Sequence, residues 1–129
     1  MWKHVGVTFI ALFLMIGMVS CQNVSDPGDT IETYLQALID DDAALAANLS
    51  CADWESQATT EGAAFEGVEA ALDKADCTAS AQDDAGLTVS CTGQIIFSYA
   101  GGEDQQIDLS ERNYLVVEEG GEWKMCGYR

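Results

Sequence analysis

The stretch "LTVSCTGQIIFSY", residues 87–99, decides the fold class of this chain. Apolar or small residues alternate in it with polar ones over most of its length, which is the pattern of a β-strand that buries one face. The positions on the predicted inner face are Leu87, Val89, Cys91, Gly93, Ile95, Phe97 and Tyr99. We therefore predict one long, half-buried strand over this stretch.

Turn motifs on both sides of this strand predict further strands. The turn "DDAG", residues 83–86, connects it to a short strand over residues 77–82. Two glycine pairs, at 101–102 and 120–121, lead into a strand over residues 104–118 and into the final "EWKMCGY". Strands joined by such short turns pair antiparallel. The C-terminal half is thus expected to form an antiparallel sheet of four or more strands.

The N-terminal half has helical periodicity instead. Asp26 precedes Pro27 as an N-cap precedes a proline at the first helical position. Apolar residues then recur at helical spacing, at Ile31, Tyr34, Leu35 and Leu38. Three aspartates, residues 40–42, break this helix; further helices are predicted over 42–50 and 66–75, with an irregular segment over 51–65. Helices followed by a meander predict an α+β fold with the helices packed on one face of the sheet.

The N-terminus has the pattern of an export signal. Lys3 precedes the uncharged stretch from Val5 to Val19, which as a helix spans about 22 Å, less than the roughly 30 Å of a bilayer core. The following "MVSC", residues 18–21, resembles the bacterial lipobox, with Met in place of the usual Leu. We expect a signal peptide over 1–20, a lipidated tether over 21–28 and one domain over 29–129. The alternative is an uncleaved membrane anchor with a chance cysteine at its end.

The cysteine count agrees with a lipidated Cys21. Assigning Cys21 to a lipid leaves an even set, Cys51, Cys77, Cys91 and Cys126. Four cysteines outside the cytoplasm predict two disulfides. A zinc site is the competing interpretation, but the chain has no CxxC pair and its one histidine, His4, lies in the signal. We expect no metal and no cofactor.

Charge restricts the partners of the mature chain. From residue 21 onward, 22 acidic residues face four basic ones, a net charge of −18. Binding to nucleic acid requires Lys and Arg to neutralise phosphates, so nucleic acid is excluded as a partner. Anionic lipid is repelled as well, so the membrane is expected to be a partner through the lipid anchor alone. A small ligand would be neutral or cationic, although Arg112, the one base in the middle of the domain, could reverse this locally.

Two stretches resemble the nuclear-transport-factor-2-like superfamily, also called cystatin-like or ketosteroid-isomerase-like. They are "DPGDTIETYLQALIDDDAALAANL", residues 26–49, and "YLVVEEGGEWKMCGY", residues 114–128. The resemblance covers residues 26–129 and is greatest to the small bacterial lipoproteins of this superfamily. It implies a strongly curved sheet wrapped around the helices, forming a cone with a pocket. The implied location is the cell envelope, on the outer face of a bacterial membrane.

The resemblance leaves two functions open, a binding module for a small molecule or a protein and, alternatively, a small-molecule isomerase, dehydratase or hydrolase. Enzymes of the superfamily place an Asp or His base in the cone near a Tyr or Asp donor, whereas this mature chain has no histidine and its tyrosines match no such pattern. Binding is therefore preferred, with no catalytic residue assigned. Candidate pocket walls are Trp54, Phe65, Phe97, Tyr99 and Trp123.

The disulfide pairing follows in part from strand register. A three-residue loop at 83–85 would place Cys77 opposite Cys91, within disulfide range. The strands that carry Cys91 and Cys126 are separated by another strand, about 9.6 Å in all, which is too far for a bond. The resembled fold brings Cys51 beside the last strand, which implies the pair Cys51–Cys126. One observation argues against that pair, because Cys126 alternates away from the apolar residues of its strand.

Lipidation of Cys21 is testable directly. Cells that express the chain and are fed a radioactive fatty acid should label the protein, because the predicted thioether-linked diacylglycerol carries acyl chains. The Cys21→Ser variant should lose the label, whereas a Ser20→Ala control should keep it. Equal labelling of the Cys21→Ser variant and the parent protein would contradict the prediction.

Overall fold

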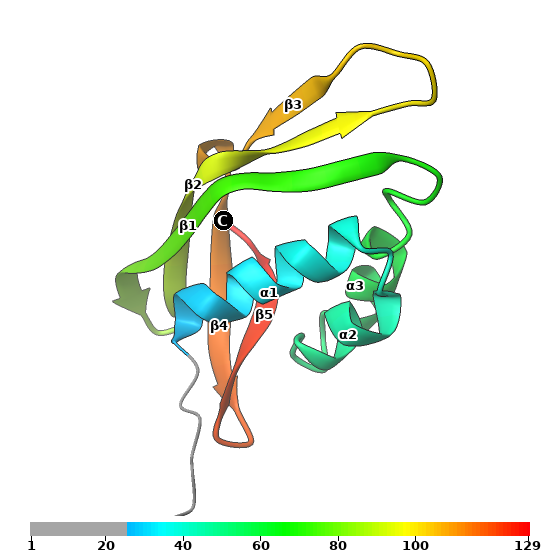
Figure 1. The fold of residues 1–129 in the computed structure, drawn as a ribbon. Coiled ribbons are helices and arrows are strands. Elements are labelled where there is room, and N and C mark those ends of the chain that lie inside the picture. Colours follow the sequence, from blue (N-terminus) through cyan, green and yellow to red (C-terminus); the bar gives the residue numbers. More distant parts are fainter. Residues whose placement is uncertain (1–25) are drawn as a thin grey trace, which may run out of the picture.

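The computed structural model describes residues 26–129 as three helices followed by a five-stranded antiparallel sheet (Figure 1). The prediction of an α+β class is therefore confirmed. Cys21, the predicted signal and most of the predicted tether lie outside the described residues. The elements are α1 (Pro27–Ile39), α2 (Ala43–Asn48), α3 (Glu55–Glu61), β1 (Glu69–Asp83), β2 (Gly86–Ser98), β3 (Gln105–Asp108), the 3-10 turn η1 (Leu109–Glu111), β4 (Asn113–Glu119) and β5 (Glu122–Tyr128).

Helix α1 begins and ends where its sequence predicts. The Asp26 side chain accepts a hydrogen bond of 2.7 Å from the Gly28 N–H, and Pro27 occupies the first turn. Asp41 takes a left-handed φ of 56° after the helix, and Asp42 caps α2 by accepting from the Leu45 N–H at 3.0 Å. The aspartate run is therefore a helix break with an N-cap. The apolar face of α1 is buried in the core, at Ile31, Tyr34, Leu35 and Leu38.

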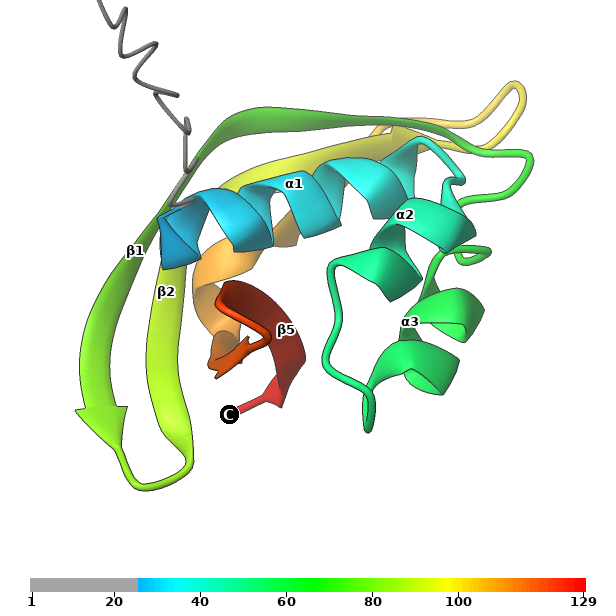
Figure 2. The ribbon, with the colours of Figure 1, turned by 90° about the horizontal axis from the view of Figure 1, so that it is seen from below.

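The sheet curves around α1 at Gly93, where β2 also changes partners. Strand β2 pairs with β1 along one edge, whereas its other edge pairs with β4 at residues 87–90 and with β3 at 94–97. Gly93 lies between these two segments with a φ of 96°, and a Cβ there would overlap the backbone carbonyl of Lys74 on β1. Figure 2 shows β1 and β2 bending around α1, which lies on their concave side.

The predicted helix over 66–75 is wrong, since β1 begins at Glu69. Its backbone pairs with β2 from Glu69 opposite Ser98 onward, and these ladder hydrogen bonds outweigh a short helical periodicity. Ala70 and Leu72 pack against the core, whereas Ala71 is exposed. The same residues therefore fit a period of two.

Two other predicted segments also differ from the structure. The segment 51–65 is not irregular, because it contains α3, a short helix that buries only Ala58 and so lacks a strong apolar pattern. The strand predicted over 104–118 is interrupted by η1, which Asp108 caps by accepting from the Ser110 N–H at 2.9 Å. The interruption turns Leu109, 3% exposed, into the core. The sheet thereby has five strands, within the prediction of four or more.

The predicted disulfide Cys77–Cys91 is present, with its Cα atoms 4.1 Å apart. The hairpin turn is nevertheless one residue shorter than predicted, since Asp83 pairs with Gly86. That register alone would shift Cys77 out of alignment with Cys91. A bulge between Ala79 and Ala81 adds one residue to β1 and restores the alignment.

The disulfide Cys51–Cys126 is present as well, with its Cα atoms 5.3 Å apart. The chain after α2 runs beside β5 as a short parallel bridge at Ser50 and Met125. Met125 N–H donates to the Leu49 carbonyl and Cys51 N–H donates to the Met125 carbonyl, both at 2.8 Å. This pairing places the two cysteines side by side at the edge of the sheet.

Two disulfides indicate an oxidising, extracytoplasmic location. Within residues 26–129, no helix has the length and apolar character needed to cross a bilayer.

Removal of the longer disulfide should destabilise the protein more. Cys51–Cys126 closes 75 residues and Cys77–Cys91 closes 14, for which the chain-entropy model gives about 4.5 and about 3 kcal/mol. Replacing each pair by two alanines and measuring urea unfolding should show the larger loss for Cys51→Ala/Cys126→Ala. An equal loss, or the reverse order, would contradict this account.

Candidate functional site

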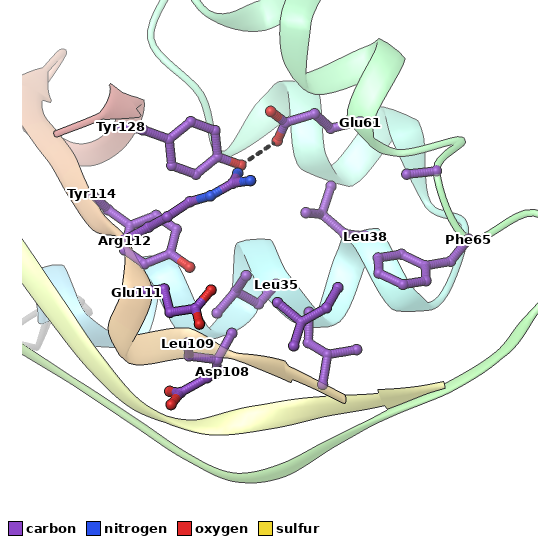
Figure 3. A pocket seen from close by; sticks show the side chains of 13 residues that line it. Leu35, Leu38, Glu61, Phe65, Asp108, Leu109, Glu111, Arg112, Tyr114 and Tyr128 are labelled. Atoms are coloured by element: carbon purple, nitrogen blue, oxygen red, sulfur yellow. Dashed lines mark hydrogen bonds between the residues drawn. The ribbon is translucent and has the colours of Figure 1, made fainter. Parts of the chain in front are cut away.

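A cavity of about 240 Å³ lies between α1, the concave face of the sheet and the chain that follows α3 (Figure 3). Drug-sized ligands occupy pockets of about 300–1,000 Å³, so this cavity suits a smaller molecule. Its lining residues are Leu35, Leu38, Glu61, Ala64, Phe65, Ile95, Ile107, Asp108, Leu109, Glu111, Arg112, Tyr114 and Tyr128.

The inner wall of the cavity is apolar. Leu35 and Leu38 come from the buried face of α1, and Ile95 comes from β2 just beyond the bend at Gly93. Leu109 enters from η1, the turn that interrupts the predicted third strand. The helix periodicity and the broken strand thus supply the apolar surface together.

Glu61, the last residue of α3, provides a fixed carboxylate at the cavity. Its Oε2 accepts hydrogen bonds from the hydroxyls of Tyr34 on α1, at 2.8 Å, and Tyr128 on β5, at 2.7 Å. The Tyr34 hydroxyl also accepts from the Trp54 indole N–H at 3.1 Å. We call these four residues the Glu61 network. It joins α3 to the first helix and the last strand.

The two phenols of this network remain neutral donors. Burial raises the pKa of Tyr34 well above its ordinary value, and the hydrogen bond to Glu61 raises it further. Burial, and after it the hydrogen bond to Glu61, also raise the pKa of Tyr128 above its ordinary value. Both hydroxyls therefore keep their protons at physiological pH, and each directs its proton at Glu61.

Arg112 carries the one positive charge of the cavity lining. Its guanidinium carbon lies 4.9 Å from the centre of the Tyr128 ring, in cation–π range. No carboxylate within residues 26–129 lies close enough to Arg112 to form an ion pair. Asp108 and Glu111 also line the cavity. With Glu61 they give three carboxylates against one guanidinium.

Asp108 already has a structural task. Its Oδ1 accepts from the Ser110 hydroxyl at 2.7 Å and from the Ser110 N–H at 2.9 Å. These bonds hold the pKa of the Asp108 carboxyl below its usual value, so it is ionised at neutral pH.

The five predicted pocket walls are spread over the molecule. Phe65 lines the cavity, and its ring packs edge to face against the ring of Phe97, with the ring centres 6.0 Å apart. Tyr99 continues this aromatic row outward and is 57% exposed. Trp54 does not line the cavity, since it packs edge-on against Tyr128 and belongs to the Glu61 network. Trp123 lies on the β4–β5 hairpin, beside two other surface depressions.

Sequence reasoning did not find Glu61. It lies in the segment predicted to be irregular, and its partners are 27 and 67 residues away in the chain. One acid among 22 carries no pattern that marks it. A correct helix prediction for residues 55–61 would have placed it at a helix end, but not beside two tyrosines.

No model of a known protein family matches the chain, and a search of curated proteins also finds no match. Within residues 26–129, no three His, Cys, Asp or Glu side chains are grouped to hold a metal ion. The function is therefore inferred from the chemistry of the cavity.

The Glu61 network should make stability depend on pH in the alkaline range. The pKa of Tyr34 in the folded protein lies above its ordinary value of 10.0, so its contribution is complete below pH 10 and is lost as the unfolded chain ionises above it. Urea unfolding at pH 8 and pH 11 should show this fall. Tyr34→Phe should be less stable at pH 8 by about 1–3 kcal/mol, because Trp54 N–H loses its acceptor. Between pH 8 and pH 11 the variant should lose less of its free energy of unfolding than the parent protein does. Parallel pH curves for the two proteins would refute the assignment.

Proposed function

We infer that this protein is a lipid-anchored, extracytoplasmic binding module of the nuclear-transport-factor-2-like superfamily, and that its cavity binds a small, partly apolar molecule. The observation that carries the inference is a cavity with an apolar inner wall and one carboxylate held by two phenols. Binding sites for small molecules combine these features, a mostly apolar lining with a few placed polar groups. The helices-first order and the curved sheet support the proposed family.

The lipid anchor at Cys21 supports this function by location. Two disulfides indicate an oxidising compartment. They use the four cysteines from residue 51 onward, so Cys21 is the one cysteine without a disulfide partner among them. The acidic surface avoids anionic lipid, so the domain would remain free on its tether at the outer face of a bacterial membrane. A cavity held there is open to molecules that reach the cell envelope.

The charges at the cavity favour a neutral or cationic ligand. Three carboxylates and one guanidinium line it, and the mature chain carries a net charge of −18. An anion would meet repulsion both at a distance and at the site. The cavity also favours a small molecule over a protein partner, because its apolar surface faces inward, between α1 and the sheet.

An isomerase or dehydratase is the second candidate, favoured by the contact of a carboxylate with two tyrosines. Such chemistry needs a carboxylate base and a neutral hydroxyl donor that reach the substrate separately. Here both phenol protons point to Oε2 of Glu61 itself. Neither of these two hydroxyls is free to donate to a substrate in this arrangement, and among the tyrosines of the lining only Tyr114 could do so. Binding is the preferred function because it requires no such donor.

A thermal-shift screen tests the binding function. The full chain, held in phosphatidylcholine nanodiscs, would be heated with a panel of small neutral, cationic and anionic metabolites. A ligand at ten times its Kd adds about 1.4 kcal/mol to the free energy of unfolding and should raise Tm by several degrees. Stabilisation is expected from neutral or cationic compounds, and stabilisation confined to anions would contradict the proposal.

A pair of neighbouring variants locates the binding site. Both alanines are exposed, but Ala64 lines the cavity and Ala63 does not. Ala64→Trp should fill the cavity and abolish the shift, and Ala63→Trp should leave it unchanged. Equal effects of the two substitutions would place the ligand elsewhere.

A further inference from the structure

We propose that the ligand of the cavity is an amine, an apolar molecule with a terminal ammonium group that binds Oε1 of Glu61. This inference rests on the proposed binding function and names the ligand class. It is carried by the direction of the hydrogen bonds at Glu61, by the position of Arg112 and by the apolar wall across from both.

The Glu61 network leaves one carboxylate oxygen available. Tyr34 and Tyr128 both donate to Oε2, and no donor within the described part of the chain reaches Oε1. An ionised carboxylate has about four acceptor sites over its two oxygens, so those on Oε1 remain. Because three elements hold the carboxylate, Oε1 is a pre-positioned acceptor whose ordering costs little on binding.

Arg112 forms no ion pair with this acceptor. The guanidinium lies over the face of the Tyr128 ring and forms no ion pair with Glu61. A cationic donor from a ligand can therefore form the charge-assisted hydrogen bond that Glu61 lacks. A carboxylate ligand would instead face Glu61, Asp108 and Glu111 with only one arginine in its favour.

The rest of the cavity suits an alkyl or aryl body. Figure 3 shows Glu61 and Tyr128 together, with Leu35 and Leu109 across the cavity from them. Phe65 and Leu38 form another apolar part of the wall. A ligand whose ammonium binds Glu61 can bury an attached hydrocarbon chain against these apolar side chains, and that burial contributes to affinity.

Three probes of equal chain length test the ligand class. The full chain in phosphatidylcholine nanodiscs would be titrated calorimetrically with n-hexylamine, n-hexanol and hexanoate at pH 7, with empty nanodiscs subtracted. Hexylamine should bind about tenfold or more tightly than hexanol, the difference expected for a hydrogen bond to a charged group. Hexanoate should bind more weakly than either.

Three variants assign the difference to Glu61. Glu61→Gln keeps an acceptor for the tyrosine hydroxyls but removes the charge, and should reduce the preference for hexylamine over hexanol about tenfold. Glu55→Gln removes an exposed charge from the same helix and should leave that preference unchanged. If Glu61→Gln fails to fold, Arg112→Gln serves in its place, because removing the nearby competing cation should tighten hexylamine binding.

The outcomes separate this inference from the function on which it rests. Equal binding of hexylamine and hexanol, unaffected by Glu61→Gln, would overturn the amine assignment and leave a binding cavity. Tightest binding of hexanoate, lost in Arg112→Gln, would overturn it in favour of an anion and would also contradict the ligand charge proposed above. Binding of none of the three probes would count against both the ligand class and the binding function.

Discussion

The bend shared by β1 and β2 is the constraint on which the rest of the structure depends. Gly93 has a positive φ, and the segment of β1 that faces it contains a bulge between Asp73 and Asp76. The two strands approach so closely there that no side chain would fit between Gly93 and the Lys74 carbonyl, and they turn together. Beyond the bend β2 exchanges β4 for β3 as its partner, and the interruption at η1 follows from that exchange. The concave face that results holds α1 and the cavity.

A second attachment places the helices over this concave face. The chain after α2 bridges to β5 at Met125, and the disulfide Cys51–Cys126 fixes the same contact covalently. Helix α3 begins four residues after Cys51, so its position follows closely from that bridge. Its last residue, Glu61, then meets hydroxyls from α1 and β5. A disulfide at the sheet edge thereby contributes to the geometry of the polar end of the cavity, even though neither cysteine lines it.

Local patterns predicted the elements whose signal lies within their own residues. The cap at Asp26 and the apolar spacing in α1 give both the position and the buried face of that helix. The alternation in residues 87–99 predicts β2 for the same reason. The start of β1 was missed because Ala70 and Leu72 fit more than one period, and its partner strand lies about 25 residues further along the chain. The pair Cys77–Cys91 was predicted from a turn one residue too long, and it is present because a bulge at Ser80 compensates.

By itself, the sequence determined the α+β class, the net acidic charge and the four cysteines from residue 51 onward that form two disulfides. These properties depend on composition, on parity and on spacing within single segments. Only the tertiary structure decided which acid of the 22 is held by two phenols at the cavity. The physical reason is that hydrogen bonds of 2.7–2.8 Å select Glu61 only after α1, α3 and β5 have been brought together. Segments so far apart in the chain are brought into contact by packing and by the Cys51–Cys126 bond. The residues around Glu61 in the sequence predict neither this contact nor its geometry.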